Sequence, residues 1–164
     1  MLSIEVVIRK AVKKDIPRII ELWKVLRDYH VRHLGYNDEI CRHRKNAVSI
    51  YKRHVTQKIR ARNYAIFVAE SDGKVVGHTI VRISKSPPIY VYNRKVYVDE
   101  LVVDKKYRGK GVGKKLLKQA EKWGKKKGLS LFSLHVAIKN KNAISLYKKF
   151  GLKEHHITMN KKIK

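Results

Sequence analysis

Cysteine and long apolar runs are scarce in this chain of 164 residues, and each scarcity excludes a class of protein. The one cysteine, Cys41, excludes an intramolecular disulfide and suits a reducing compartment, so we expect a cytoplasmic protein. No apolar run approaches the roughly 20 residues that cross a bilayer, which predicts that the protein has no membrane partner. The N-terminus has no charged segment followed by an apolar core, so no signal peptide is expected.

Acidic residues are also scarce, and the charge balance is strongly positive. The chain has 40 Lys and Arg against 13 Asp and Glu, a formal net charge of +27 at pH 7. Such a field attracts polyanions and speeds the association of anionic ligands. Three explanations stay open: proximity to RNA or the ribosome, recruitment of an anionic cofactor, and a Lys-rich surface typical of proteins from hot environments.

The pattern of apolar and turn-forming residues predicts one α/β domain over residues 1–164, without a linker or repeat. Asp15 caps the first helix, and Ser71-Asp72-Gly73 forms a hairpin turn. The second helix is expected to carry an exposed basic face of Arg42, Arg44, Lys45, Lys52, Arg53 and Lys58. Strands are predicted at 4–9, 64–70, 74–84, 95–103, 130–136 and 153–159, and helices at 15–33, 38–59, 112–127 and 141–149. The order β-α-α-β-β-β-α-β-α-β predicts a mixed central sheet with helices on both faces.

A glycine-rich turn between a strand-like run and a helix-like segment is the most informative feature. Such a turn exposes backbone N–H groups at a helix N-terminus, where the helix dipole also favours negative charge, so it predicts a diphosphate site. The turn lacks the Ser or Thr of a Walker loop, and the following strand lacks the acidic end of a dinucleotide fingerprint. Taken alone, it could also be a flexible basic turn. Its residues are Arg108, Gly109, Lys110, Gly111, Val112, Gly113 and Lys114.

A second motif follows at 140–152, where Asn140, Ala143, Tyr147 and Gly151 stand at fixed spacing. With the first motif, it makes the chain resemble the GNAT family of acetyl-CoA-dependent N-acetyltransferases over essentially its whole length. The resemblance implies that the glycine turn holds the coenzyme A diphosphate and that Lys110, Lys114 or Lys115 meets its 3′-phosphate. It also implies that Asn140 binds the pantetheine arm and that Tyr147 lies near the thioester sulfur as a general acid. Without the resemblance, Tyr147 reads as a core residue four positions after Ala143.

The strand before the glycine turn carries acidic residues in an otherwise basic protein. Strand alternation predicts that Asp99 and Glu100 point to opposite faces, with one or both partly buried. A buried carboxylate needs a reason: either is a candidate general base, and the alternatives are an ion pair of Asp99 with Arg82 and an exposed Glu100. The resemblance implies that Leu101, Val102 and Val103 pair with the pantetheine arm, and that a bulge separates this strand from the next. The alternation falters at Asp99-Glu100.

His135 is a further candidate, on the next strand. The run Leu134-His135-Val136 resembles a subgroup of protein N-terminal acetyltransferases, in which a strand Tyr, here Tyr97, acts with this His as a base. A lone His is otherwise more often a core residue. Tyr36, Tyr97 and Asp99 are expected to contact the acceptor, which the segment 34–62 would wall. His155 and His156 are adjacent on a predicted strand and make a poor metal pair, so no metal site is expected.

The sequence therefore predicts an enzyme that moves an acetyl group from acetyl-CoA directly to a primary amine. An α-amine of a peptide or protein is mildly favoured, because its pKa is near 7.7–8.0 against 10.4 for lysine. A lysine, a small amine or a polyamine stays open as the acceptor. The competing class is a non-catalytic basic module that binds RNA or the ribosome. A monomer and a homodimer are both compatible with the sequence.

Overall fold

The computed structural model describes residues 5–36 and 41–163, and within them five strands and four α-helices. Short 3-10 turns at Lys13–Asp15 and Lys105–Tyr107 precede the first helix and the glycine turn. The elements are β1 (Val7–Lys10), α1 (Ile16–Leu34), α2 (Ala47–Lys58), β2 (Tyr64–Ser71), β3 (Lys74–Lys85), β4 (Arg94–Val103), α3 (Val112–Lys126), β5 (Phe132–Leu134) and α4 (Lys141–Phe150).

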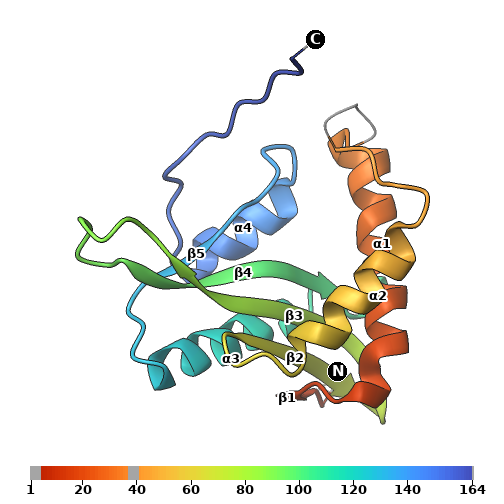
Figure 1. The fold of residues 1–164 in the computed structure, drawn as a ribbon. Coiled ribbons are helices and arrows are strands. Elements are labelled where there is room, and N and C mark those ends of the chain that lie inside the picture. The colour runs from red at the N-terminus through yellow and green to blue at the C-terminus, as the bar shows by residue number, and fades with distance from the viewer. Residues whose placement is uncertain (1–4, 37–40, 164) are drawn as a thin grey trace.

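The sheet has the strand order β1-β2-β3-β4-β5 (Figure 1). The first three pairs are antiparallel and the β4–β5 pair is parallel, so the sheet is mixed, as predicted. Asp72 and Gly73 connect β2 to β3 with φ values of 50° and 71°. A tight hairpin turn with two positive φ angles favours this Asp-Gly pair, and the predicted turn is confirmed.

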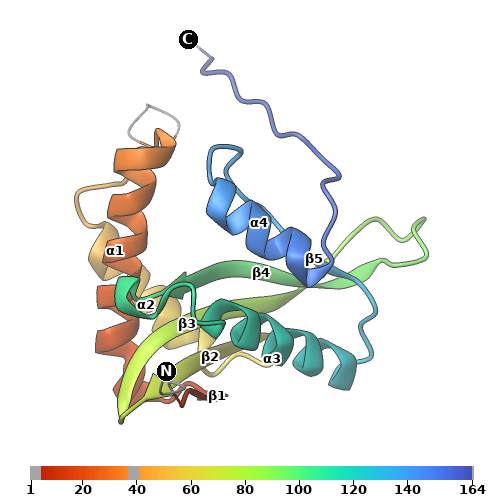
Figure 2. The same cartoon turned by 180° about the vertical axis from the view of Figure 1, so that it is seen from behind.

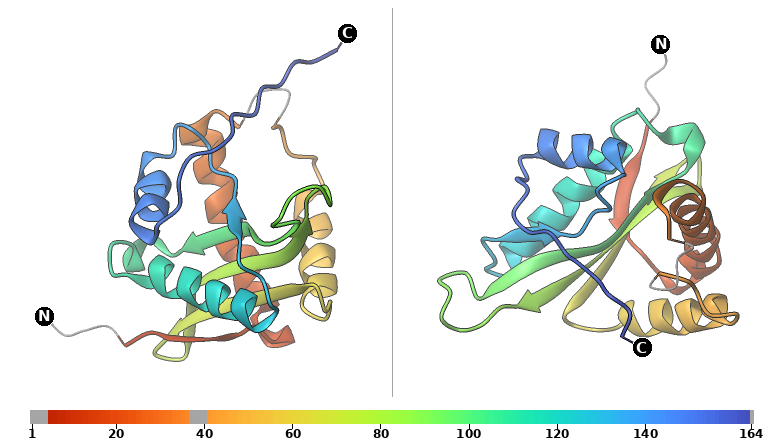
Figure 3. Two further views of the ribbon diagram at one scale, coloured as in Figure 1. Left: turned by 90° about the vertical axis from the view of Figure 1, so that its left-hand side faces the viewer. Right: turned by 90° about the horizontal axis from the view of Figure 1, so that it is seen from above.

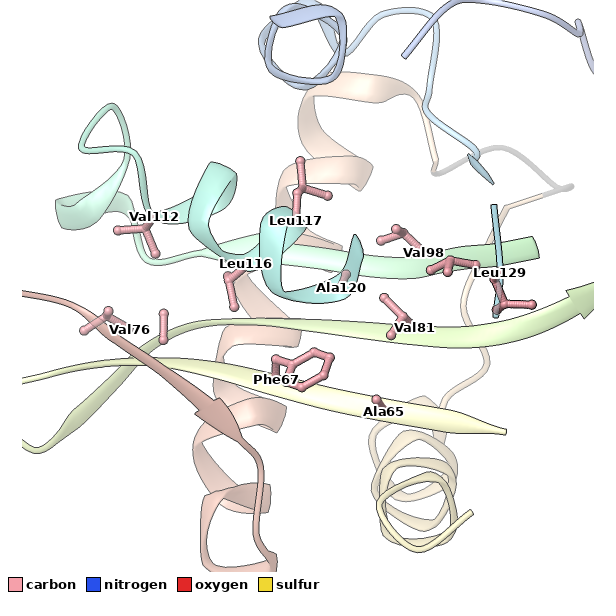
Figure 4. Packing of buried hydrophobic residues seen from close by; sticks show 12 residues of the cluster. Ala65, Phe67, Val76, Val81, Val98, Val112, Leu116, Leu117, Ala120 and Leu129 are labelled. Atoms are coloured by element: carbon pink, nitrogen blue, oxygen red, sulfur yellow. The ribbon is translucent and has the colours of Figure 1, made fainter. Parts of the chain in front are cut away.

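Helices α3 and α4 cover one face of the sheet, and α1 and α2 cover the other, as the edge-on view shows (Figure 3). On the first face, Leu116, Leu117 and Ala120 of α3 are fully buried against β2, β3 and β4 (Figure 4). A Cβ built on Gly124 would lie 2.1 Å from Val96 Cγ2, so glycine is what allows α3 to approach β4 this closely. The predicted two-faced α/β sandwich is confirmed.

The second face is a separate apolar cluster. Ile19 and Leu22 of α1 and Val55 of α2 pack on strand residues that include Ile66 and Val68, all nearly inaccessible to solvent. Figure 2 shows α1 running past the sheet. The described part of the chain has no helix that is long and apolar enough to cross a membrane.

Three predicted elements differ from the structure. The strand predicted at 130–136 is reduced to Phe132–Leu134, so His135 lies just after β5 and not on it. The second helix begins at Ala47, and residues 41–46, a run rich in basic side chains, are not helical. The predicted cap Asp38 lies outside the described residues. The predicted strand at 153–159 does not form: the chain leaves the body after α4 (Figure 1), and Ile157 and Met159 are 83% and 90% exposed.

Candidate active site

A bulge in β4 creates the candidate site. Ile80 of β3 pairs with Glu100, and Val81 pairs with Val98, so Asp99 is an extra residue in the ladder. The parallel pairing with β5 ends at the same point, at Val98 opposite Leu134. From Asp99 onward, the edge of β4 that faces away from β3 is therefore not paired with β5, which is the separation that the family resemblance implied.

The bulge turns both acidic side chains to one face. Asp99 and Glu100 line the same pocket, of about 490 Å³, beneath α2. The aromatic rings of Trp23, Tyr51 and Tyr64 form much of its wall, with Trp23 and Tyr51 stacked at 4.2 Å between centroids. The prediction that the two carboxylates point to opposite faces is wrong, because the extra residue resets the alternation.

Two cationic side chains form ion pairs with the carboxylate of Asp99. Lys58 Nζ donates to Oδ2 at 2.7 Å, and Arg82 Nε donates to Oδ1 at 2.8 Å. The hydrogen bond from Arg82 raises the pKa of its own guanidinium. The Lys58 side chain is only 8% exposed, which corrects its predicted place on an exposed basic face: an ion pair with Asp99 compensates its burial. The alternative pairing with Arg82 is present.

Glu100 is nearly buried, with 11% of its side chain exposed, in contrast to the exposed alternative. Its Oε1 accepts a hydrogen bond from the Tyr51 hydroxyl at 2.7 Å and a short one from His78 Nε2. Burial, followed by the charge of Glu100, raises the pKa of Tyr51, which keeps its hydroxyl a donor. Within the described ranges, Oε2 has no hydrogen-bonding partner in the protein.

His78 is a residue of the site that was not predicted from the sequence. Its ring is fully buried in β3, between β2 and β4. A signal was present, because His78 and Thr79 interrupt the otherwise apolar run from Val75 to Val81. A buried polar side chain in such a run needs a partner, and the partner here is Glu100.

Tyr97 and His135 are in contact, as the resemblance to the N-terminal acetyltransferases implied. The Tyr97 hydroxyl makes a short hydrogen bond with His135 Nδ1, and the two rings lie edge to face at 5.5 Å between centroids. Burial raises the pKa of Tyr97, so its phenol stays protonated at neutral pH and is able to donate to the imidazole. The Arg82 guanidinium lies 4.5 Å from the Tyr97 ring centroid, which connects this pair to Asp99.

The glycine turn leaves backbone N–H groups available at the N-terminus of α3. Gly109 and Gly111 have φ values of 75° and 78°, and a Cβ at either would meet nothing within 4 Å. The Lys115 N–H donates to Gly111 O at 3.0 Å, so the N–H groups of 112–114 precede the first helical hydrogen bond. Arg108 Nε donates to Val103 O at 3.0 Å and ties the turn to the end of β4.

The open edge of β4 presents alternate backbone groups. Asp104 N donates to Val76 O, so the backbone of Asp104 faces β3. Strand alternation then turns the backbone of Leu101 and Val103 to the open edge and that of Val102 to β3. Val102 is 3% exposed, and its side chain belongs to the core beneath α1. The geometry thus gives edge positions to Leu101 and Val103, but not to Val102.

Helix α4 lies beside this edge. Asn140 Oδ1 accepts from Ala143 N at 3.2 Å and caps the helix, leaving its amide nitrogen free of described partners. Tyr147 packs against the same cluster as Leu101 and Val103, and burial raises its pKa to about 12. Both the core and the catalytic interpretation of Tyr147 agree with this position.

Tyr36 lies at the end of α1, outside the pocket lining. Its ring is 4.9 Å from that of His30, between centroids. Burial lowers the pKa of His30, and the nearby charge of Glu100 opposes that shift. The structure therefore places Tyr36 near the acidic site through His30 rather than on the pocket wall.

A family model describes most of the chain. The model of the acetyltransferase (GNAT) family matches residues 21–152, which include β4, the glycine turn and α4. The chain belongs to this acetyltransferase family. The resemblance carried by the two sequence motifs is thereby confirmed.

Two curated relatives match parts of this chain. An uncharacterised N-acetyltransferase of Methanocaldococcus jannaschii is 28% identical over 92% of this chain and 62% of its own length. An N-alpha-acetyltransferase of Sulfurisphaera tokodaii is 39% identical over 55% of this chain and 57% of its own. The chain thus spans less than two thirds of either relative.

Solved structures share the fold across nearly the whole chain. A mutant Bacillus halodurans protein has a TM-score of 0.84 and 21% identity, covering 96% of this chain and 99% of that one. A predicted acetyltransferase of Clostridium acetobutylicum, solved with acetyl-CoA, has a TM-score of 0.75 and 19% identity, with coverages of 95% and 96%. These likenesses establish the fold.

Proposed function

We propose that this protein is an acetyl-CoA-dependent N-acetyltransferase whose acceptor is the α-amine of a peptide or protein. The observation that carries the proposal is the open edge of β4, with the glycine turn at its end and Glu100 at its start. An edge of this kind pairs with an extended ligand as an added strand does. Because the bulge sits at that junction, the edge and the acidic pocket open from neighbouring residues.

The residues present fit acetyl-CoA. The N–H groups of 109–114 would hold the diphosphate, with Lys110, Lys114 or Lys115 near the 3′-phosphate. Leu101 and Val103 would pair with the pantetheine arm, and the free amide nitrogen of Asn140 would donate to it. When bound, acetyl-CoA supplies a thioester carbon to the amine nitrogen, so that the C–N bond forms as the C–S bond breaks and its electron pair leaves on sulfur.

Glu100 is the best-placed proton acceptor for the incoming amine. Its Oε2 accepts from no donor among the described residues, whereas both oxygens of Asp99 already accept from cations. We therefore assign Asp99 to charge compensation of Lys58 and Arg82. The Tyr97–His135 pair is exposed at His135 and connects the site to solvent, which suits a relay that passes the proton outward.

The choice of an α-amine rests on the free energy of deprotonation. A lysine has a pKa about 2.5 units above that of an α-amine, which costs about 3.4 kcal/mol more at 1.36 kcal/mol per unit. The formal charge of +27 lowers the pKa of either amine further. The relative from Sulfurisphaera tokodaii bears the name N-alpha-acetyltransferase, in agreement with this choice.

A mass-spectrometric assay tests the function. The protein is incubated with acetyl-CoA and two peptide pools, one with free α-amines and blocked lysines and the other with the reverse. We expect acetylation in the first pool. Acetylation confined to the second pool would replace the α-amine by lysine, and acetylation in neither would point to a small amine. Failure to bind acetyl-CoA as well would favour the basic module that binds RNA or the ribosome.

Replacing Tyr147 by Phe tests the general acid. A pKa of about 12 keeps the phenol protonated throughout the neutral range, so it can donate a proton to the leaving sulfur. We expect Tyr147→Phe to lower kcat by about 100-fold at every pH between 6 and 9, with unchanged acetyl-CoA affinity. The matched control is Tyr107→Phe, which keeps a ring beneath Lys110 near the glycine turn. Equal kcat values for the two variants would rule out general acid catalysis by Tyr147.

A further inference from the structure

One buried polar atom is not explained by the fold. His78 Nδ1 lies inaccessible in the core without a hydrogen-bonding partner in the described part of the chain, while Nε2 of the same ring bonds Glu100 Oε1. A proton on Nδ1 would be a buried donor with no acceptor, which is costly, whereas a bare nitrogen lone pair costs less. The ring is therefore neutral, with its proton on Nε2. In this tautomer His78 is a donor to Glu100.

We propose that His78 is a positioning residue for Glu100, holding the carboxylate ionised and its Oε2 free to receive the acceptor amine. Only the role of Oε2 in receiving the amine rests on the proposed function. Tyr51 lies on α2 and His78 lies on β3, and both bond Oε1. One oxygen of the carboxylate is therefore held by side chains from two different elements. Both donors favour the charged form of Glu100, which its burial would otherwise disfavour.

These hydrogen bonds also fix the orientation of the carboxylate. Thr79 Oγ1 donates to the Glu100 carbonyl at 2.8 Å, which holds the backbone of the bulged residue pair. Glu100 lines the pocket together with Trp23 and Tyr51, and because its backbone and Oε1 are both held, Oε2 is the carboxylate oxygen left for a ligand there. A carboxylate oxygen beside aromatic faces is a suitable site for an ammonium group. The acceptor thus enters as a cation and gives its proton to an oxygen already oriented toward it.

Several other charged or titratable groups face Glu100 and set the background of its titration. Burial lowers the pKa of His30 on α1 and of His54 on α2, and the nearby charge of Glu100 opposes the shift in both. Among the described residues, the charged and titratable groups around the site are His30, Tyr51, His54, Lys58, Tyr64, His78, Arg82 and Asp99. Of these side chains, Tyr51 and His78 are the ones that bond the Glu100 carboxylate.

Nuclear magnetic resonance tests the proposal without acetyl-CoA or an amine. In ¹⁵N-histidine protein, we expect His78 to be neutral and protonated at Nε2 across pH 6–8, its signals assigned by their loss in His78→Gln. In ¹³C-glutamate protein, we expect His78→Met to move the Glu100 midpoint up by about one pH unit, because a donor to the charged form is lost. His78→Gln places an amide N–H near the same oxygen and should leave the midpoint in place.

Thr79→Val is the matched control. It removes the buried hydroxyl of the residue that follows His78, and this hydroxyl bonds the backbone of Glu100 and not its carboxylate. It should leave the midpoint unshifted even if it lowers the melting temperature. A doubly protonated His78, a proton on Nδ1, or equal Glu100 midpoints in wild type and His78→Met would overturn the proposal. A shifted midpoint in a protein that acetylates no amine would leave the positioning role intact and contradict the proposed function.

Discussion

Replacing Gly111 by Glu is expected to weaken acetyl-CoA binding by about 100-fold. Gly111 precedes α3 with φ +78°, a conformation that costs an L-residue about 1–3 kcal/mol, and each 1.4 kcal/mol is tenfold in affinity. The new carboxylate also stands at the helix N-terminus, where it would repel the diphosphate and compete for the same N–H groups. Isothermal titration calorimetry with acetyl-CoA measures the change.

Gly128→Glu provides a control matched in geometry. Gly128 has φ +70° and open space around its Cβ, but it follows the opposite end of α3. It carries the same backbone strain without access to the glycine turn, so its affinity should stay within a few-fold of wild type. Gly111→Ala separates strain from charge and should fall between the two. Equal losses in Gly111→Glu and Gly128→Glu would remove the diphosphate site from this turn.

Most of the fold was predictable because its signals are local. Asp72-Gly73 determines a tight hairpin turn through its positive φ angles, and Gly35 ends α1 in the left-handed conformation at the predicted break. The glycine turn was equally local, since it needs a strand before it, a helix after it and residues without a Cβ between them. These features depend on neighbours in the sequence, which a single chain displays directly.

The acidic site was less predictable, because its geometry depends on register. One extra residue in β4 brings Asp99 and Glu100 to the same face. The partners of these carboxylates come from β3 and α2, far away in sequence, and include the buried Lys58 and His78. From the sequence, a basic side chain on a helix is predicted to be exposed unless its acidic partner is known. Periodicity gives the face of each element but not the register between elements.

The missing last strand has a different cause. The alternation at 153–159 is compatible with a strand, but an isolated strand is stable only when an edge accepts it. The described tail makes no ladder with β5, and its apolar side chains stay exposed. Local propensity was thus outweighed by the absence of a pairing partner in the described part of the chain.

Glu100→Gln is expected to lower kcat/KM for an α-amine peptide by about 100- to 1,000-fold. The amide oxygen can still accept from Tyr51 and His78, so the pocket and the acetyl-CoA affinity should be preserved. What is lost is a group able to take the proton of the amine. The pH–rate profile reports this directly, because the acidic limb set by Glu100 should disappear in the variant.

The matched control makes the same chemical change elsewhere in the sheet. Glu70 of β2 is an ion-paired carboxylate that contacts Arg9, away from the pocket, and Glu70→Gln should leave kcat/KM and its profile unchanged. The profiles of Tyr97→Phe and His135→Ala complete the comparison. If Glu100 takes the proton and the pair passes it to solvent, these two variants should lose less activity than Glu100→Gln and keep the acidic limb. A full loss in His135→Ala with a retained rate in Glu100→Gln would instead place the base at the Tyr97–His135 pair.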